Sequence, residues 1–351
     1  MIILGTRPEV LKLFPIIEEF KKKKIKTCIV FTGQHNELAR DMINTFKIKL
    51  TYALNVMVTN QPLGTLSENL HRALENVLIE EKPDLVIVQG DTTTAFVGAL
   101  ASFYYRIPVA HIEAGLRTDD IYQPFPEEGN RRMISQIATY NFAPTTGAAE
   151  NLKKNDVPGQ IFITGNTGID TLLTLSKDIE VEQKNQVLVT LHRRESLGKP
   201  LKNILKGIKL FLDQFPGWQI VFPVHPNPLV KDIVHKIFGN NRQVILRAPA
   251  DYKTMVTLMK ESVFILTDSG GIQEEAPSLN KPVLVAREKT ERPEGIASGV
   301  AILVGTDTNI ISNNMCELAT RGEFYRSMIN KQNPYGDGHA SSKIVEHLLN
   351  I

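Results

Sequence analysis

Acidic residues stand at three points where the chain leaves short apolar segments. Asp91 follows the apolar run that ends at Val88, Glu113 follows the run that ends at His111, and Glu127 comes after the proline-rich loop beyond it. Each carboxylate could simply cap a helix or satisfy its dipole. Neighbouring carboxylates can also separate their pKa values and divide acid and base roles between them. The three positions together favour proton-transfer chemistry.

The second half of the chain offers cations and glycines at equivalent points. His192 is followed by two arginines, and His225 stands after the next apolar run. Ser269–Gly271 follows a further run, and backbone N–H groups beside glycine can approach an anion closely. Glu275, about one helical turn further on, could accept the hydroxyl hydrogens of a ribose. Arg292 follows the next run and adds a cation.

A further anion site is predicted where the first apolar run ends. Gly5 permits a tight turn, Thr6 suits a helix N-cap, and Pro8 suits the first helical position. Such a helix would open with its free N–H groups and Arg7 facing the strand ends, with Lys12 about one turn along. The alternative is an ordinary helix cap with surface charges.

The elements that must position these residues are predicted from hydrophobic periodicity. Short β-branched runs recur, each separated from the next by enough chain for a helix, which is typical of parallel sheets covered by helices. Ligands of such sheets lie beyond the carboxyl ends of the strands. The predicted strands are 1–4, 27–31, 84–88, 108–111, 141–143, 161–163, 186–191, 219–224, 243–246, 262–267, 282–285 and 301–304. Apolar residues at helical spacing predict helices around 11–20, 66–78 and 201–211.

The fold class expected from this order is α/β, with two Rossmann-like domains that face each other. A charged, sparsely apolar stretch at 178–184 reads as a linker or the end of a linking helix. We expect an N-terminal domain at 1–170 that carries the acid/base residues, and a C-terminal nucleotide-binding domain at 171–333. Residues 334–351 are expected to form a helix that packs back on the N-terminal domain.

Composition excludes several protein classes. The 351 residues are 42% hydrophobic and 22% charged, which is typical of a globular protein and not of a disordered one. A formal charge of +2 shows no bulk preference for nucleic acid or an acidic membrane. Two cysteines allow no disulfide framework, and no apolar run is long enough to span a membrane. With no evident signal peptide, we expect a cytoplasmic protein.

Several catalytic signatures are missing from the sequence. It contains no Gly-x-Gly-x-x-Gly after a strand and no Walker-type Gly-Lys-Ser/Thr, so dinucleotide redox chemistry and P-loop phosphoryl transfer are unsupported. It also contains no His-Glu-x-x-His and no Gly-x-Ser-x-Gly. The residues alone therefore predict an enzyme that acts on a nucleotide-linked small molecule.

An ordered set of motifs resembles the non-hydrolysing UDP-N-acetylglucosamine 2-epimerases. Any one motif is weak, but the set is specific and extends to a closing Asn333–Gly338. The motifs are Gly5–Glu9, Gly90–Thr92, His111–Arg117, Pro126–Glu128, His192–Glu195, Asp268–Glu275 and Glu291–Glu294.

This resemblance implies a GT-B arrangement with the site in the cleft, a homodimer, and no need for NAD or a metal. It implies interconversion of UDP-GlcNAc and UDP-ManNAc for bacterial surface polysaccharides, with UDP eliminated across C1–C2 to leave a 2-acetamidoglucal. Which carboxylate removes the C2 proton and which returns it stays open. The implied catalytic residues are Asp91, Glu113, Glu127 and His192, and the implied substrate-binding residues are Arg7, Lys12, Arg131, Ser269, Gly270, Gly271, Glu275 and Arg292.

Many members of that family bind a second UDP-GlcNAc as an activator. The matching positions are Gln34, His35 and His225. Departures from the family pattern are small: Leu191 stands where many relatives carry Gly or Ala, and Gln89 stands where some carry His.

Three other functions compete with this one. A hydrolysing epimerase would release free ManNAc and UDP, and a GT-B glycosyltransferase would need an acceptor. A nucleotide-sugar sensor would bind without turnover. UDP release, solvent deuterium incorporation at C2 and amide substitution of the carboxylates distinguish them.

Overall fold

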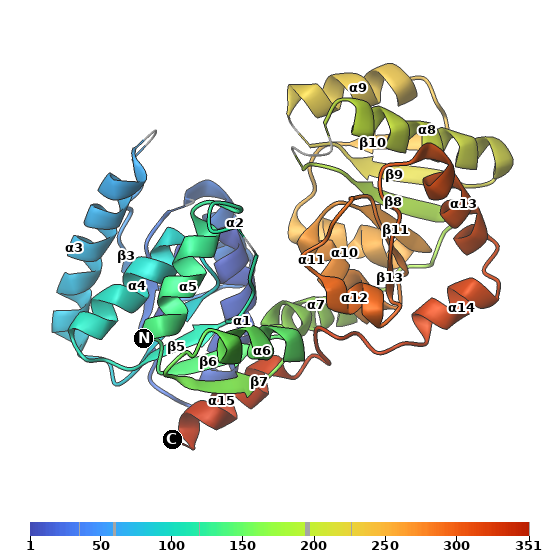
Figure 1. Ribbon diagram of the computed structural model, residues 1–351. Helices are drawn as coiled ribbons and strands as arrows, with labels where there is room; N and C mark the ends of the chain where they lie inside the picture. Colours follow the sequence, from blue (N-terminus) through green and yellow to red (C-terminus); the bar gives the residue numbers. More distant parts are fainter. Residues whose placement is uncertain (35, 59–60, 119, 194–196, 226, 351) are drawn as a thin grey trace. The chain divides into compact units, whose positions relative to one another are not determined.

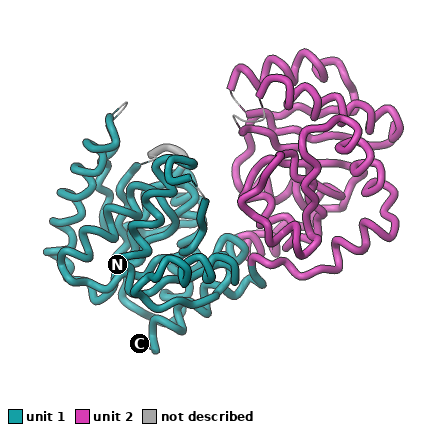
Figure 2. Tube along the Cα trace, viewed as in Figure 1, with its two compact units in different colours: residues 1–171, 336–351 teal, residues 172–335 magenta. Residues whose placement is uncertain are grey.

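The computed structural model describes residues 1–34, 36–58, 61–118, 120–193, 197–225 and 227–350, and its contacts divide the chain into two units (Figures 1 and 2). Unit 1 holds residues 1–171 and 336–351, and unit 2 holds residues 172–335. The chain therefore passes between the units twice. The expected domain bounds, 1–170, 171–333 and 334–351, remain a prediction about domains that fold separately. Within the described residues, no helix is both long enough and apolar enough to cross a membrane.

Unit 1 is built on a seven-stranded parallel sheet in the order β3-β2-β1-β4-β5-β6-β7. The strand order reverses between β1 and β4, and ligands of open α/β sheets bind at such a switch point. The elements are β1 (Ile2–Leu4), α1 (Arg7–Lys22), β2 (Ile29–Phe31), α2 (Asn36–Thr45), β3 (Tyr52–Ala53), α3 (Leu63–Glu81), β4 (Val86–Gln89), α4 (Thr93–Tyr104), β5 (Val109–Ile112), α5 (Glu127–Ile137), β6 (Tyr140–Ala143), α6 (Thr146–Lys154), β7 (Gln160–Ile163) and α15 (Ala340–Leu349). The helix α7 (Thr167–Lys177) begins in unit 1 and ends in unit 2.

Unit 2 repeats the plan with a six-stranded parallel sheet in the order β10-β9-β8-β11-β12-β13. Its switch point lies between β8 and β11. The elements are β8 (Gln186–Thr190), α8 (Lys199–Gln214), β9 (Gln219–Pro223), α9 (Pro228–Phe238), β10 (Val244–Arg247), α10 (Tyr252–Glu261), β11 (Phe264–Thr267), α11 (Gly270–Glu275), the 3₁₀ helix η2 (Ala276–Leu279), β12 (Val283–Val285), α12 (Pro293–Ala297), β13 (Ala301–Leu303), α13 (Thr308–Ala319) and α14 (Glu323–Ile329).

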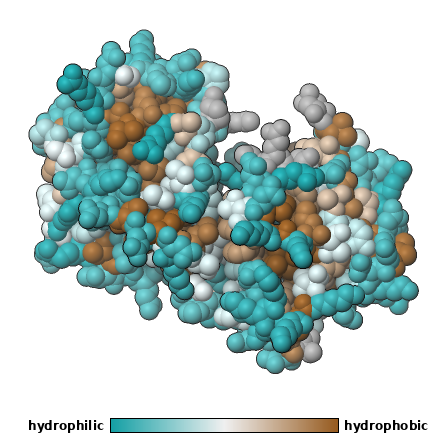
Figure 3. Space-filling model, turned by 180° about the vertical axis from the view of Figure 1, so that it is seen from behind, coloured by the Kyte–Doolittle hydropathy of each residue, from teal (hydrophilic) through white to brown (hydrophobic). Residues whose placement is uncertain are grey.

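The predicted fold class, α/β with two Rossmann-like parts, is confirmed by these two sheets. The predicted helices also bury the side chains that the periodicity selected: Leu66, Leu70, Leu74 and Leu78 of α3 are all buried. Each such leucine contributes about 1.5–3 kcal/mol by leaving water. Figure 3 shows one face of the molecular surface, which is largely hydrophilic with separate apolar patches.

The helix α15 completes unit 1 from the far end of the chain. It packs against α1, and the ring of His347 lies 4.3 Å from that of Phe162 in β7. The buried carboxylate of Asp170 in α7 accepts hydrogen bonds from the backbone N–H groups of Ala340 (3.2 Å) and Ser341 (2.7 Å). A side chain of α7 thereby satisfies the exposed donors at the start of α15.

Candidate active-site residues at the two sheet edges

Asp91 stands at the carboxyl end of β4, one residue before the N-cap of α4. Its carboxylate forms an ion pair with the guanidinium of Arg131 in α5, and its backbone carbonyl accepts a hydrogen bond from Asn130 (2.9 Å). Burial raises the pKa of Asp91, Arg131 opposes that rise, and the negative charges of Glu113 and Glu127 add to it. The three predicted carboxylates therefore interact electrostatically in one place.

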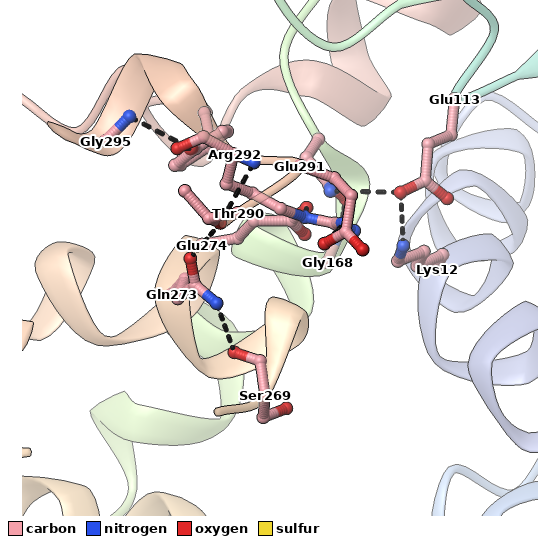
Figure 4. A network of polar contacts seen from close by, with 12 residues as sticks. Lys12, Glu113, Gly168, Ser269, Gln273, Glu274, Thr290, Glu291, Arg292 and Gly295 are labelled. Carbon is pink, nitrogen blue, oxygen red and sulfur yellow. Dashed lines mark hydrogen bonds and ion pairs between the residues drawn. The ribbon is translucent and has the colours of Figure 1, made fainter. Parts of the chain in front are cut away.

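Glu113 follows β5 and is held by side chains from other elements of unit 1. Lys12 of α1 donates to its Oε1 at 2.5 Å, as Figure 4 shows, and Asn166 donates to the same oxygen at 3.5 Å. Gln89, the last residue of β4, donates to Oε2. The backbone of Glu113 has φ of +63°, a left-handed conformation that is uncommon for non-glycine residues.

Glu127 and Glu128 open α5 but differ in their surroundings. Glu127 is partly exposed, whereas Glu128 is fully buried and accepts hydrogen bonds from Arg132 (2.6 Å) and from the backbone of Thr118 (3.1 Å). Glu128 therefore anchors the loop before α5, and Glu127 is the one that solvent can reach.

His111 lies inside the sheet and not among the reactive groups. Its Nε2 contacts the carbonyl of Gly90 at 2.7 Å, and burial lowers its pKa to about 4. A neutral, buried imidazole there fixes the turn that carries Asp91.

The start of α1 is fixed by Glu9. The buried carboxylate of Glu9 accepts hydrogen bonds from the backbone N–H groups of Gly5 (3.0 Å) and Thr6 (2.7 Å), and from the hydroxyl of Thr92 (2.8 Å). Glu9 therefore joins the turn after β1 to the turn after β4, while Arg7 stays exposed at the first position of α1. Burial raises the pKa of Glu9 to about 7 despite these hydrogen bonds.

In unit 2, His192 follows β8 and is paired with Asp268 after β11. The imidazole Nδ1 lies 3.0 Å from Oδ1 of Asp268, whose side chain is 0% exposed against 41% for His192. Burial alone would raise the pKa of Asp268, but hydrogen bonds from the His192 ring and from the backbone of Arg193 outweigh it and lower that pKa. The anionic Asp268 orients His192 toward solvent.

The turn between β11 and α11 is shaped for close approach. A Cβ on Gly270 would lie 3.0 Å from the guanidinium carbon of Arg292, and a Cβ on Gly271 would meet nothing within 4 Å. Arg292 donates to Glu274 at 2.8 Å (Figure 4). Ser269 is the N-cap residue of α11, and its backbone carbonyl accepts a hydrogen bond from Gln273 (3.2 Å). The glycines leave room for the guanidinium on one side and for a ligand on the other.

A cluster of arginines surrounds Glu291, next to Arg292. Arg287 donates to its carboxylate at 2.7 and 3.1 Å, and Arg193 lies at 3.6 Å. Burial would raise the pKa of Glu291, but these cations lower it to about 2. Glu275, the last residue of α11, lies near Tyr252 of α10. Burial and this neighbouring carboxylate raise the pKa of Tyr252.

Two of the three predicted activator residues lie within the described chain. The side-chain oxygen of Gln34 accepts hydrogen bonds from the backbone (3.0 Å) and hydroxyl (2.8 Å) of Thr94, in the first turn of α4. The ring of His225 stacks on that of His192 at 6.1 Å between centroids. His35 lies outside the described residues.

The sites contain residues that sequence reasoning passed over. Gln89, Asn166, Glu9 and Asp268 each hold a predicted site residue or its turn through hydrogen bonds. Gln89 carried a visible signal, since it is a polar residue at the end of an otherwise apolar strand.

Comparisons with known proteins agree with this geometry. The family model described as UDP-N-acetylglucosamine 2-epimerase matches residues 18–349. The Bacillus subtilis UDP-N-acetylglucosamine 2-epimerase is 45% identical, with 99% of this chain and 94% of that protein covered. The solved structure of UDP-GlcNAc 2-epimerase from Neisseria meningitidis bound to UDP-GlcNAc matches with a TM-score of 0.89 and 42% identity, covering 100% of this chain and 99% of that one. A putative UDP-N-acetylglucosamine 2-epimerase from Listeria monocytogenes matches with a TM-score of 0.94 and 35% identity, covering 100% and 96%.

These matches agree with a GT-B-like pair of domains and with an isomerase. They span essentially the whole chain, as the motif resemblance did. The chain belongs to the UDP-N-acetylglucosamine 2-epimerase family.

Proposed function

We propose that the protein interconverts UDP-GlcNAc and UDP-ManNAc by inverting C2 of the sugar, without net hydrolysis. Family membership and the UDP-GlcNAc bound to the Neisseria meningitidis relative support the substrate class. The observation that carries the chemistry is the placement of Asp91 and Glu113 directly beyond the adjacent strands β4 and β5 of unit 1, where burial and neighbouring negative charges raise the pKa of Asp91.

The proposed reaction is an elimination followed by an addition. The C2–H bond gives its proton to a carboxylate, its electron pair forms the C1–C2 double bond, and the C1–O bond breaks with its electrons leaving on UDP. The intermediate is a 2-acetamidoglucal. A carboxylic acid then protonates C2 from the other face, and a phosphate oxygen of UDP closes the bond to C1. Both steps need groups that move protons and cations that stabilise the leaving diphosphate.

Unit 1 supplies the proton-transfer groups in this proposal. A carboxyl such as Asp91, whose pKa is raised by burial and by neighbouring negative charges, can hold and release a proton. Glu113 and Glu127 complete the acid/base set. Arg131 stabilises the ionised form of Asp91, and Arg7 and Lys12 contribute positive charge toward the sugar and diphosphate.

Unit 2 supplies the nucleotide contacts. Ser269, Gly270 and Gly271 present backbone N–H groups to the diphosphate, Glu275 accepts hydrogen bonds from the ribose, and Arg292 adds a cation. His192, oriented by Asp268, approaches the leaving diphosphate. The elimination and addition proposed here move protons and UDP but no hydride, which is consistent with the resemblance to a family that needs no NAD or metal.

The proposal extends to partners and context by the same resemblance. A second UDP-GlcNAc acts as an activator at Gln34, His35 and His225, and stacking of His225 on His192 connects that site to the catalytic set. A second copy of the chain covers exposed apolar side chains of α3 and α4, among them Ile79, Phe103 and Tyr104. The product supplies surface polysaccharide synthesis in the cytoplasm.

The test follows C2 of the sugar by NMR in deuterated water, with UDP-GlcNAc as the sole added substrate. We expect UDP-ManNAc to form with deuterium at C2, because the proton removed exchanges with solvent before reprotonation. Free UDP should stay far below the amount of sugar turned over.

Three outcomes would contradict the proposal. Stoichiometric UDP release would indicate a hydrolysing epimerase, and exchange that requires an acceptor sugar would indicate a glycosyltransferase. Binding without exchange would indicate a sensor. A hyperbolic rate dependence on UDP-GlcNAc, with UDP-ManNAc alone epimerised at full rate, would contradict the proposal that a second UDP-GlcNAc activates the enzyme.

A further inference from the structure

Gln89 occupies an unusual place at the carboxyl end of β4. It is 3% exposed, and its backbone pairs in register with Ile112, the residue directly before Glu113. The side-chain amide donates a hydrogen bond to Oε2 of Glu113. A buried glutamine is thus aimed at a carboxylate of the neighbouring strand end.

The other oxygen of Glu113 is engaged from two further elements. Lys12 donates to Oε1 from α1, and Asn166 donates to it from the turn before α7. The backbone at Glu113 is left-handed, a conformation that is uncommon for a non-glycine residue. Donors on both oxygens favour the ionised carboxylate over the neutral acid.

We propose that Gln89 is a positioning residue for the epimerisation: its amide donor keeps Glu113 ionised and turned toward Lys12 before the sugar binds. This inference rests on the proposed function and assigns a state to one of its carboxylates. Because an amide does not titrate, its donor persists at every working pH.

The titratable groups near Glu113 come from three elements. They include Lys12 on α1, Asp91 after β4 and His111 in β5. Burial lowers the pKa of His111 to about 4, so this imidazole is neutral near pH 7, and Lys12 forms an ion pair with Glu113. Loss of the Gln89 donor therefore removes a hydrogen bond that favours the ionised form of Glu113. Repulsion from the carboxylate of Asp91 also favours the neutral form of Glu113.

The experiment measures kcat for C2 exchange against pH in Gln89→Leu and Gln89→Glu, both close to glutamine in volume. Without the donor, Glu113 protonates at higher pH, and a second carboxyl beside it strengthens this effect. We expect the acid limb of kcat to move up by about one pH unit in Gln89→Leu and further in Gln89→Glu. On the acid side of the wild-type limb, Gln89→Leu should therefore have about tenfold lower kcat than the wild type, and most of this loss should disappear by pH 9.

A matched control separates this role from packing. Gln186 is also a buried glutamine on a strand, and its amide donates to Ser262 at 3.0 Å in unit 2. Gln186→Leu should lower the thermal midpoint as Gln89→Leu does, yet keep the wild-type acid limb.

Two results would overturn the inference while leaving the epimerase proposal intact. One is a wild-type enzyme that exchanges C2 while both Gln89 variants keep its acid limb. The other is a loss of kcat that is equal at every pH. A wild-type enzyme without C2 exchange would instead refute the proposed function.

Discussion

At the carboxyl edges of the two sheets, the pKa values of acidic side chains are shifted in opposite directions. In unit 1, burial raises the pKa of Glu9 to about 7, and the pKa of Asp91 also lies above its ordinary value. In unit 2, hydrogen bonds and cations overcome burial, so that the pKa of Glu291 falls to about 2 and that of Asp268 also falls.

The difference lies in the neighbours and not in the fold. Both sheets are parallel, and each reverses its strand order at the point where these residues gather. Acids whose pKa burial raises toward neutrality can exchange protons near neutral pH, whereas acids held by cations and hydrogen-bond donors serve as fixed counter-charges that orient cations. In the proposed mechanism, the same architecture therefore serves proton transfer in one unit and anion binding in the other.

The largest expected effect comes from removing the proton-carrying acid of unit 1. Asp91→Asn should lower kcat for C2 exchange about 10³-fold, because an amide does not transfer a proton to carbon. NMR in deuterated water measures this, and Asp41→Asn on the exposed face of α2 is the control. Retention of about a tenth of the activity would place proton transfer on another residue.

The raised pKa of Glu9 predicts a stability that falls as pH rises. Its folded value of about 7 exceeds its ordinary 4.5, so the folded chain binds this proton more tightly than the unfolded chain does. The contribution, up to about 3 kcal/mol, is full below pH 4.5 and lost as pH rises through 7.

Glu9→Gln should therefore lose less free energy of unfolding between pH 5 and pH 8 than the wild type. Urea unfolding at the two pH values measures it, with Glu68→Gln, which is 65% exposed on α3, as the control. Parallel pH dependences for Glu9→Gln and the wild type would show that Glu9 does not titrate in this range.

The cation side of the comparison is tested with Arg292→Gln. The amide can still donate to Glu274, so the fold is kept, but the positive charge is lost. UDP affinity should weaken about tenfold to hundredfold, since charge-assisted hydrogen bonds to phosphate are worth about 1.5–3 kcal/mol. Calorimetric titration with UDP measures it, and Arg326→Gln on the exposed face of α14 should bind as the wild type does.

The smallest expected effect concerns Glu291. Its lowered pKa stabilises the fold above pH 4.5, and this contribution is lost as pH falls toward 2. Glu291→Gln should cost about 1 kcal/mol at pH 7, reduced by the partial exposure of the side chain. Thermal midpoints at pH 7 and pH 3.5 should show a difference from wild type that narrows at the lower pH; a constant difference would reflect packing alone.

Much of the architecture follows from hydrophobic periodicity. Each predicted strand lies within about two residues of an observed one. The pattern missed β3, because Tyr52–Ala53 has only two residues and neither is buried. A strand shows hydrophobic periodicity in its sequence when one of its faces is buried against a core. This edge strand has no buried residue, so its sequence carries no such pattern.

The residues of the candidate site are harder to predict from the sequence than the fold is. The positions of Asp91, Glu113 and His192 beyond strand ends could be predicted from the sequence, and strand ends in parallel sheets are the usual ligand sites; their roles in the reaction stay a prediction. Gln89 and Asp268 could not be assigned roles, since each acts on a residue of a neighbouring strand end. Such pairs depend on strand order and register, which single-sequence patterns do not specify.

The capping of α15 by Asp170 bears on how the chain is made. A ribosome releases residues 1–171 first, yet the partners of Asp170 and the helix that covers part of α1 emerge only after all of unit 2. The carboxylate-bearing unit is thus begun first and finished last. A nascent chain truncated before Ala340 could hold a complete unit 2, while Asp91, Glu113 and Glu127 sat on a complete sheet whose covering helices were not all in place.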